Sequence, residues 1–223
     1  MIPLKDDVPS RSFPAVTIAL IAANVLVFLY EISLGARGQE ALIYGTAVIP
    51  YQITHFRAAS ASIVPPPFTI ISSMFIHGGL LHIGGNMLFL WIFGDNVEDS
   101  LGHLKFFLFY FGTGIVASLT QIFANPSSTV PVIGASGAIA GILGAYFILF
   151  PRAKIYTLVF LIVFVTIVRI PAVIFLGLWF LIQVLSSGFA SGIAWYAHIG
   201  GFIAGAIVVM IIGRNRPGGI FAT

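Results

Sequence analysis

The stretch "GASGAIAG" (134–141) lies in the middle of a very apolar chain and holds one serine among glycines and alanines. Residues this small allow helices to approach closely, and Gly137 and Gly141 have the GxxxG spacing of packed membrane helices. Packing alone would explain a lone serine at this place. The other reading makes Ser136 a nucleophile, and polar residues elsewhere in the chain must decide between the two.

The composition is that of an integral membrane protein. Of the 223 residues, 59% are hydrophobic and only 8% are charged, and the mean hydropathy is +1.07. A soluble domain carries about 25% charged residues, so this chain cannot cover a surface that faces water. The net charge of +3 comes without a basic run, so we expect no nucleic-acid partner. The absence of cysteine excludes disulfides, a thiol nucleophile and thiolate metal sites.

We predict an all-α fold, a bundle of six transmembrane helices that forms one membrane domain over residues 1–223. A membrane helix needs about 20 apolar residues. The segments that qualify are 13–30, 78–94, 104–123, 135–150, 171–187 and 191–212. Residues 31–66 hold charges and a Pro-Pro-Pro run, and we expect them to form a long first external loop. The β-branched run 155–168 is short for a crossing and is expected to be interfacial or partly extended.

The distribution of basic residues predicts the orientation of this bundle. With six spans and a cytoplasmic N-terminus, the C-terminus is also cytoplasmic, and eight Lys and Arg residues fall in inner segments. Only Arg37 and Arg57 fall in outer segments. This bias follows the positive-inside rule. We therefore expect a multi-pass protein of the cell membrane, in a prokaryote the plasma membrane.

Two further segments place polar side chains where the bilayer penalises them, which makes each one a candidate functional residue. "HGGLLHIGGN" (77–86) holds His77, His82 and Asn86, and the last two are four residues apart on one helix face. "AHIGGFIAG" (197–205) holds His198. Hydrogen bonds between helices are the alternative explanation, above all for His77. A metal site of three histidines is a further alternative, although no carboxylate or thiol lies near them.

The predicted topology brings these residues to a similar depth. The second, fourth and sixth spans all enter from the outer face, with His82 and Asn86 in the outer half of the second and Ser136 in the first turn of the fourth. His198 lies on the order of 10 Å into the sixth. Close packing at the glycines of the fourth and sixth spans would bring Ser136 and His198 together.

A serine beside a histidine can act as an activated nucleophile for acyl transfer. The acidic residues on the outer side are Glu31 and Glu40, both in or near the first loop, so we expect a catalytic dyad rather than a triad. The developing oxyanion would find donors in the Asn86 amide, the His82 ring and the backbone N–H of Ser136. Gly134 would let the chain approach closely before the nucleophile.

These three segments resemble the signatures of the rhomboid intramembrane serine proteases, namely His-x4-His-x3-Asn, Gly-x-Ser-Gly and Ala-His-x2-Gly-x3-Gly. "RIPAVIFLGLWFLIQ" (169–183) is similar to the family's segment around its fifth helix, and the resemblance covers about 67–205. It implies a six-helix protease that cleaves transmembrane substrates near the outer leaflet. The roles it implies are Ser136 as nucleophile, His198 as general base, His82, Asn86, the Ser136 N–H and Gly134 as the oxyanion site, His77 as a further motif position, and Gly201 and Gly205 as packing glycines.

The sequence departs from the family's pattern at two places. Many members have a Trp-Arg pair in the first loop, where the nearest candidates here are Tyr51, Phe56 and Arg57. Some bacterial members have an aromatic residue four positions after the nucleophile that stacks on the histidine. That position is Ala140 in this chain, so another residue must hold the histidine, with Trp195 or Tyr196 as candidates.

The partners expected from this reading are transmembrane protein substrates and the lipid bilayer, with no cofactor and no metal. Substrate helices must unwind before cleavage, so helix-weakening residues near the membrane surface are expected in them. The family resemblance implies a small residue at the cleaved position. One rival function is a non-catalytic rhomboid-like protein that binds transmembrane helices. Another is a small channel or transporter with a histidine proton path, which the lack of intramembrane carboxylates disfavours.

Overall fold

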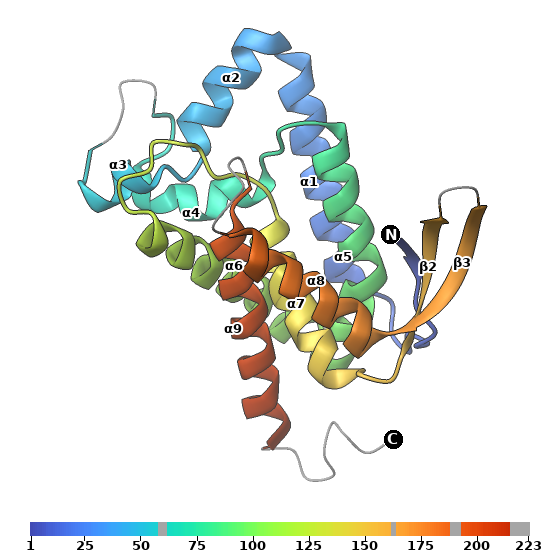
Figure 1. Cartoon of the computed structure of the whole chain (residues 1–223). Helices are drawn as coiled ribbons and strands as arrows, with labels where there is room; N and C mark the ends of the chain where they lie inside the picture. The colour runs from blue at the N-terminus through green and yellow to red at the C-terminus, as the bar shows by residue number, and fades with distance from the viewer. Residues whose placement is uncertain (58–61, 162–163, 188–192, 215–223) are drawn as a thin grey trace.

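The computed structural model describes residues 1–57, 62–161, 164–187 and 193–214. Figure 1 shows helices grouped around a central one, α7, with a β-hairpin at one side of the group. The long or apolar helices are α1 (Ala15–Ser33), α5 (Leu80–Leu101), α6 (His103–Ala124), α7 (Ser136–Leu149), α8 (Ala172–Ser186) and α9 (Trp195–Arg214).

Each of the six apolar segments predicted from the sequence coincides with one of these helices, although α5 continues seven residues beyond the predicted end at 94. Of the described helices, α1, α6 and α9 are long and apolar enough to cross a membrane. A fourth candidate is Pro66–Phe75 taken together with Leu80–Leu101, which are bent by 81°. Helices α7 and α8 are apolar but shorter. The protein is therefore a mostly helical membrane protein. Residues 191–192 of the predicted last span, and Arg216, lie outside the described residues.

The segment between the first and second predicted spans is more structured than the loop expected at 31–66. It contains α2 (Gly35–Thr46) and α3 (Pro50–Thr54). The chain then reaches α5 through short turns, which are η1 (Pro66–Phe68), α4 (Thr69–Ser72) and η2 (Ser73–Phe75). Figure 1 shows α2 at the end of the bundle where α5 begins.

The prediction of an all-α fold was wrong in one respect, because the chain also forms a three-stranded antiparallel sheet. Its strands are β1 (Ile2–Lys5), β2 (Lys154–Leu161) and β3 (Phe164–Pro171), in the order β1-β2-β3. The expectation that 155–168 is partly extended is confirmed. The run is rich in Val, Ile, Thr, Phe and Tyr, which favour strands, and its length suits a hairpin better than a membrane crossing.

Helix α7 forms the core of the bundle. Every residue from Ala138 to Tyr146 is buried, since α5, α6, α8 and α9 all pack against this helix. The fully buried aromatic rings of Phe93 and Tyr146 meet edge to face, with centroids 5.0 Å apart. An apolar helix surrounded in this way holds its first residue, Ser136, at a fixed position in the bundle.

Glycines set the close contact between α7 and α9. A Cβ atom on Gly201 would lie 2.1 Å from the carbonyl oxygen of Gly137, and one on Gly205 would lie 1.9 Å from that of Gly141. Any side chain at these positions would therefore collide with the backbone of α7. The close approach of these two helices, expected from the sequence, is found in the structure.

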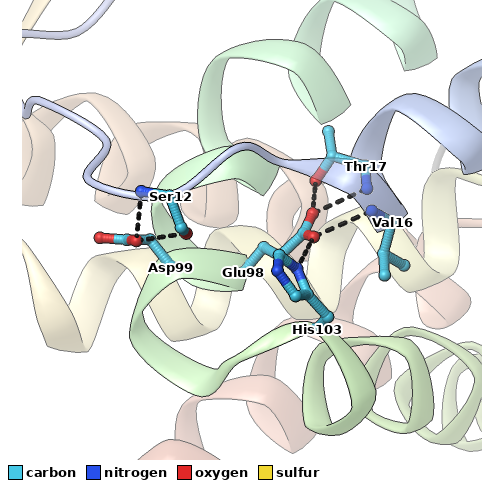
Figure 2. A network of polar contacts seen from close by, with 6 residues as sticks. All are labelled: Ser12, Val16, Thr17, Glu98, Asp99 and His103. Carbon is cyan, nitrogen blue, oxygen red and sulfur yellow. Dashed lines mark hydrogen bonds and ion pairs between the residues drawn. The ribbon is translucent and has the colours of Figure 1, made fainter.

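A buried carboxylate fixes the start of α1. The N-cap residue of α1 is Pro14, which offers no side-chain cap. Glu98, near the end of α5, instead accepts hydrogen bonds from the backbone N–H groups of Val16 and Thr17, from the Thr17 hydroxyl and from His103 (Figure 2). A carboxylate at a helix N-terminus also complements the helix dipole. These contacts join α1, α5 and α6 at one end of the bundle.

Candidate active site

The side chains of Ser136 and His198 meet between α7 and α9. Ser136 is the first residue of α7 and His198 lies in the first turn of α9, and the Ser136 Oγ is 2.8 Å from the His198 Nε2. These residues are 62 positions apart in the chain. The tight glycine contacts between the two helices bring their first turns together, so this pairing follows from the packing of α7 on α9.

The other ring nitrogen of His198 contacts a residue that the sequence analysis did not consider. The Nδ1 of His198 lies 2.7 Å from the Oε1 of Gln183, on α8. An amide oxygen only accepts hydrogen bonds, so Nδ1 carries the ring hydrogen and Nε2 presents its lone pair to the serine. In this tautomer the Ser136 hydroxyl donates to His198, which is the arrangement that a general base requires.

Aromatic rings surround the same imidazole. The ring of Trp179 on α8 has its centroid 5.9 Å from that of His198, and the ring of Trp195 lies 6.4 Å away, edge to face. Trp195 was one of the residues expected to hold His198 in place of the missing aromatic at Ala140. The structure places Trp195 at the edge of the ring and adds two contacts from α8, Trp179 and Gln183.

His82 and Gly134 lie beside this pair. The Nδ1 of His82 accepts a hydrogen bond of 3.3 Å from the backbone N–H of Gly78, so the ring hydrogen is on Nε2. A Cβ atom on Gly134 would lie only 2.6 Å from that Nε2. Gly134 also has a φ of +113°, which a side chain rarely tolerates. The chain can therefore pass this closely before Ser136 only because residue 134 is glycine.

Asn86 is held from behind by His77. The fully buried His77 has its Nδ1 3.3 Å from the Phe75 carbonyl, so its Nε2 is the acceptor for the Asn86 amide, 2.9 Å away. The backbone N–H of His77 in turn contacts the buried carboxylate of Glu31, at 3.2 Å and 3.3 Å. One N–H of Asn86 is thus used to fix the side chain, and the other is left for the space in front of Ser136.

A cavity of about 1040 Å³ opens onto these side chains. Gly78, His82, Asn86, Ser136 and His198 line it, together with polar side chains from α6 and the loop that follows it, namely Gln121, Asn125 and Ser128. A hollow with this many polar side chains can hold water next to the serine.

Most of the residues expected from the sequence thus gather in one place: Ser136, His198, His82 and Asn86 around the cavity, Gly134 beside His82, His77 behind Asn86, and Gly201 and Gly205 at the helix contact. Tyr196 lines the cavity, but the contacts to His198 come from Gln183, Trp179 and Trp195. Among the described residues, no three His, Asp or Glu side chains are placed to share a metal ion.

The sequence analysis missed Gln183, Glu31 as a contact of His77, and Gln121, whose amide oxygen accepts from the backbone N–H of Ala197 at 3.3 Å. Gln183 carried a usable signal. It is the one polar side chain in the helix segment "AVIFLGLWFLIQVL" (172–185), and a lone amide inside an apolar helix needs a partner.

The fold and the site define a helical membrane protein with a serine–histidine pair at a polar cavity. A sequence model described as the Rhomboid domain matches residues 66–215, which is about two thirds of the chain. The chain belongs to the rhomboid family.

Several relatives support this membership. The chain is 34% identical to "Rhomboid protein 1, mitochondrial" of Saccharomyces cerevisiae over 155 residues, which are 65% of this chain and 41% of the yeast protein. It is 29% identical to the rhomboid protease GluP of Bacillus subtilis over 209 residues, 92% of this chain and 36% of that protein. It is 26% identical to the rhomboid protease AarA of Providencia stuartii, with 87% and 71% covered. The chain thus spans less than half the length of the first two.

Proposed function

We propose that this protein is an intramembrane serine endopeptidase that cleaves transmembrane substrates through a Ser136–His198 dyad. The observation that carries the proposal is the distance of 2.8 Å between the Ser136 Oγ and the His198 Nε2, in a tautomer whose lone pair faces the hydroxyl. The names of two relatives, the rhomboid proteases GluP and AarA, agree with it.

The chemistry begins when the Ser136 oxygen forms a bond to the scissile carbonyl carbon and its proton moves to the Nε2 of His198. The tetrahedral intermediate then loses its amine, which takes that proton from Nε2 as the C–N bond breaks. A water molecule hydrolyses the resulting acyl-enzyme by the same steps, with His198 again accepting and returning the proton. The polar cavity beside the pair would supply this water.

The negative oxygen of the intermediate has three candidate donors. They are the Nε2–H of His82, the second N–H of the Asn86 amide and the backbone N–H of Ser136, which is the first residue of α7 and has no carbonyl partner within the helix. Gly134 keeps the space in front of His82 open. In this proposal His77 has the role of orienting Asn86, and Glu31 that of holding His77.

We further propose that the chain crosses the membrane six times, with both termini in the cytoplasm and the site near the outer leaflet. Helix α7 ends at Leu149 and is followed by Arg152, which the positive-inside rule places at the inner surface. The 14 residues of α7 span about 20 Å, while the hydrocarbon layer is about 30 Å thick. Ser136 would therefore lie about 10 Å below the outer boundary of this layer.

The proposed substrates follow from this depth. A segment that reaches Ser136 must leave its helical conformation inside the membrane, so substrates with helix-weakening residues near the outer surface are favoured. By family resemblance we propose a small residue at the cleaved position. We propose the cell membrane as the location. The names of the relatives cover a mitochondrial protein as well as bacterial ones, and locating the protein in its own cells tests this proposal.

The test is cleavage in proteoliposomes that contain the purified protein and a model transmembrane substrate with a glycine and an alanine near one end. We expect the wild type to cut near that end, and both Ser136→Ala and His198→Ala to lose activity by at least about 1000-fold while remaining folded. Cleavage that persists in folded Ser136→Ala would overturn the proposal. So would a folded wild type that binds such helices and cuts none, which is the behaviour of a non-catalytic rhomboid-like protein.

A further inference from the structure

We propose that Gln183 is a third, uncharged member of the catalytic group, a positioning residue that fixes the tautomer and the orientation of His198. This inference rests on the proposed protease function. In the usual arrangement a carboxylate accepts the hydrogen bond from the Nδ1 of the catalytic histidine. No carboxylate contacts His198 in the part of the chain that the structure describes, and the Oε1 of Gln183 occupies that place, 2.7 Å from Nδ1.

The amide of Gln183 can turn only one face to the histidine. Its Nε2 donates a hydrogen bond of 3.2 Å to the backbone carbonyl of Trp179, one turn earlier on α8. The flipped amide would place its oxygen against the Trp179 carbonyl oxygen, so two acceptors would face each other and this hydrogen bond would be lost. The oxygen is therefore held toward Nδ1, so the ring hydrogen stays on Nδ1 and the lone pair on Nε2 faces Ser136.

The surroundings make this contact strong and specific. Gln183 is 5% exposed, so water cannot easily replace it as the partner of the ring. Trp179 and Gln183 are four residues apart and lie on one face of α8, and both contact His198. One turn after the histidine, Phe202 packs against Trp179 and Phe180, with centroids 6.1 Å and 4.6 Å away. The imidazole of His198 is thus held by contacts with Ser136 on α7 and with Trp179 and Gln183 on α8.

A purely structural role is the competing explanation, because an amide between two membrane helices can simply hold them together. The two roles differ in what they change. Loss of a structural contact lowers stability. Loss of a positioning contact lets the ring turn or exchange its tautomer, so the fraction of enzyme with a correctly aimed lone pair falls. That loss lowers kcat and leaves the substrate KM unchanged.

The experiment compares wild type with Gln183→Met and Gln183→Glu, using both substrate cleavage and the rate of labelling by a fluorophosphonate, which reacts with activated serines. Methionine has nearly the shape of glutamine, but its thioether sulfur accepts hydrogen bonds only weakly. We expect Gln183→Met to lower kcat and the labelling rate by about 10- to 100-fold at unchanged KM. The matched control is Ile182→Leu, the preceding residue on α8, which is 46% exposed and away from the site. It should match the wild type.

Gln183→Glu provides the diagnostic readout. A carboxylate restores the acceptor and favours the protonated imidazole, so activity should return and the acid limb of the pH–rate profile should move to higher pH. The polar groups from the packed helices that contact His198 or line the same cavity include His82 on α5, Gln121 on α6, Ser136 on α7 and Gln183 on α8. Of these, only His82 carries a second imidazole, and it is present in both proteins, so the shift between the wild-type and Gln183→Glu profiles reports on His198.

Two results would overturn the inference. One is a folded Gln183→Met that keeps the wild-type kcat and labelling rate. The other is a defect in Gln183→Met that Gln183→Glu neither repairs nor moves along the pH axis, since that pattern belongs to a packing residue. Failure of the protease proposal itself looks different, because wild type would then be as unreactive toward the fluorophosphonate as Ser136→Ala.

Discussion

At the scale of single residues, the site depends on hydrogen-bond partners that decide where each imidazole hydrogen lies. The Phe75 carbonyl fixes the tautomer of His77, the backbone N–H of Gly78 that of His82, and the Gln183 amide that of His198. His82 and His198 therefore both turn Nε2 toward the cavity, His82 with a hydrogen that it can donate and His198 with a lone pair that can accept a proton. Among the residues that the structure describes, no carboxylate contacts His198, so this arrangement needs no ionised partner there.

Gly134→Ala tests the oxyanion side of the site. The new Cβ would lie 2.6 Å from the Nε2 of His82 at a φ of +113°, so both the loop and the ring must move. We expect a loss of about 100-fold in kcat, which is the usual effect of removing one oxyanion donor. The control is Gly84→Ala on α5, where a Cβ meets nothing within 4 Å. Equal activity of the two variants would contradict the role given to Gly134.

We expect the stability of the protein to depend on pH through Asp6, which lies in the segment before α1. Burial raises the pKa of Asp6 from 3.8 to about 6, against the opposing effect of the hydrogen bond from the Tyr146 hydroxyl. The folded protein therefore holds this proton more tightly than the unfolded chain does. The protonated Asp6 therefore adds to the free energy of unfolding. This contribution is fully present below pH 3.8 and is lost as the pH rises through about 6.

Asp6→Asn should remove this loss, because the amide remains uncharged and still accepts from Tyr146. We expect the thermal midpoint in detergent to fall between about pH 5 and about pH 8 in wild type, and to fall less in Asp6→Asn. Asp99→Asn, whose carboxylate contacts Ser12, is the control and should keep the wild-type slope. Identical slopes for wild type and Asp6→Asn would contradict the assignment.

At the scale of the elements, the sequence predicted the helices well and the supporting contacts poorly. Hydrophobic length placed the apolar helices, and the polar residues inside them pointed to Ser136, His198, His82 and Asn86. The role of Gln183 was not predicted, because which helix face meets the histidine depends on how α8 packs on α9. The sheet was only partly predicted, since an apolar run of this length fits both an interfacial segment and a strand.

The contact between α7 and α9 gives the sharpest prediction for an element. Gly205→Ala adds one carbon that would lie 1.9 Å from the Gly141 carbonyl oxygen, so the helices must separate. We expect a loss of about 2–3 kcal/mol in the free energy of unfolding, together with reduced cleavage as Ser136 and His198 move apart. Gly112→Ala on α6 meets nothing within 4 Å and should be neutral or slightly stabilising. A fully stable Gly205→Ala would show that the helix contact is not tight.

The hairpin of β2 and β3 is expected to lie in the membrane interface. Successive residues of β3 from Val165 to Arg169 are exposed, so both of its faces are open, and most of these side chains are apolar. Its outer edge would leave backbone groups unpaired in hydrocarbon, which favours the interface over the bilayer centre. At its base, Lys5 and Arg169 each lie 5.0 Å from the ring centre of Tyr156, an arrangement suited to lipid headgroups.

Because the chain has no cysteine, single-cysteine variants can locate the hairpin directly. An environment-sensitive dye on Ile167→Cys, in proteoliposomes, should show blue-shifted emission and quenching by lipid-bound quenchers. The same dye on Thr129→Cys, an exposed position in the loop after α6, should behave as in water. Water-like emission at both positions would place the hairpin outside the membrane.

At the scale of the whole molecule, the central helix α7 explains how the proposed hydrolytic site can exist within a membrane protein. The helix is shorter than the bilayer, it is covered on all sides by its neighbours, and its first residue opens onto a polar cavity. In the proposed mechanism the base comes from α9 and its orienting amide from α8, while the oxyanion donors come from α5 and from α7 itself. The proposed cleavage would therefore require the intact bundle rather than any one segment.

The central claim is that His198 activates Ser136 as a nucleophile, and one measurement tests it most directly. The folded protein is treated with a fluorophosphonate, digested and mapped by mass spectrometry. The account predicts a single adduct on Ser136 in the wild type, formed at least about 100-fold more slowly in folded His198→Ala. An adduct on a different serine, or equal labelling of Ser136 in His198→Ala, would contradict it.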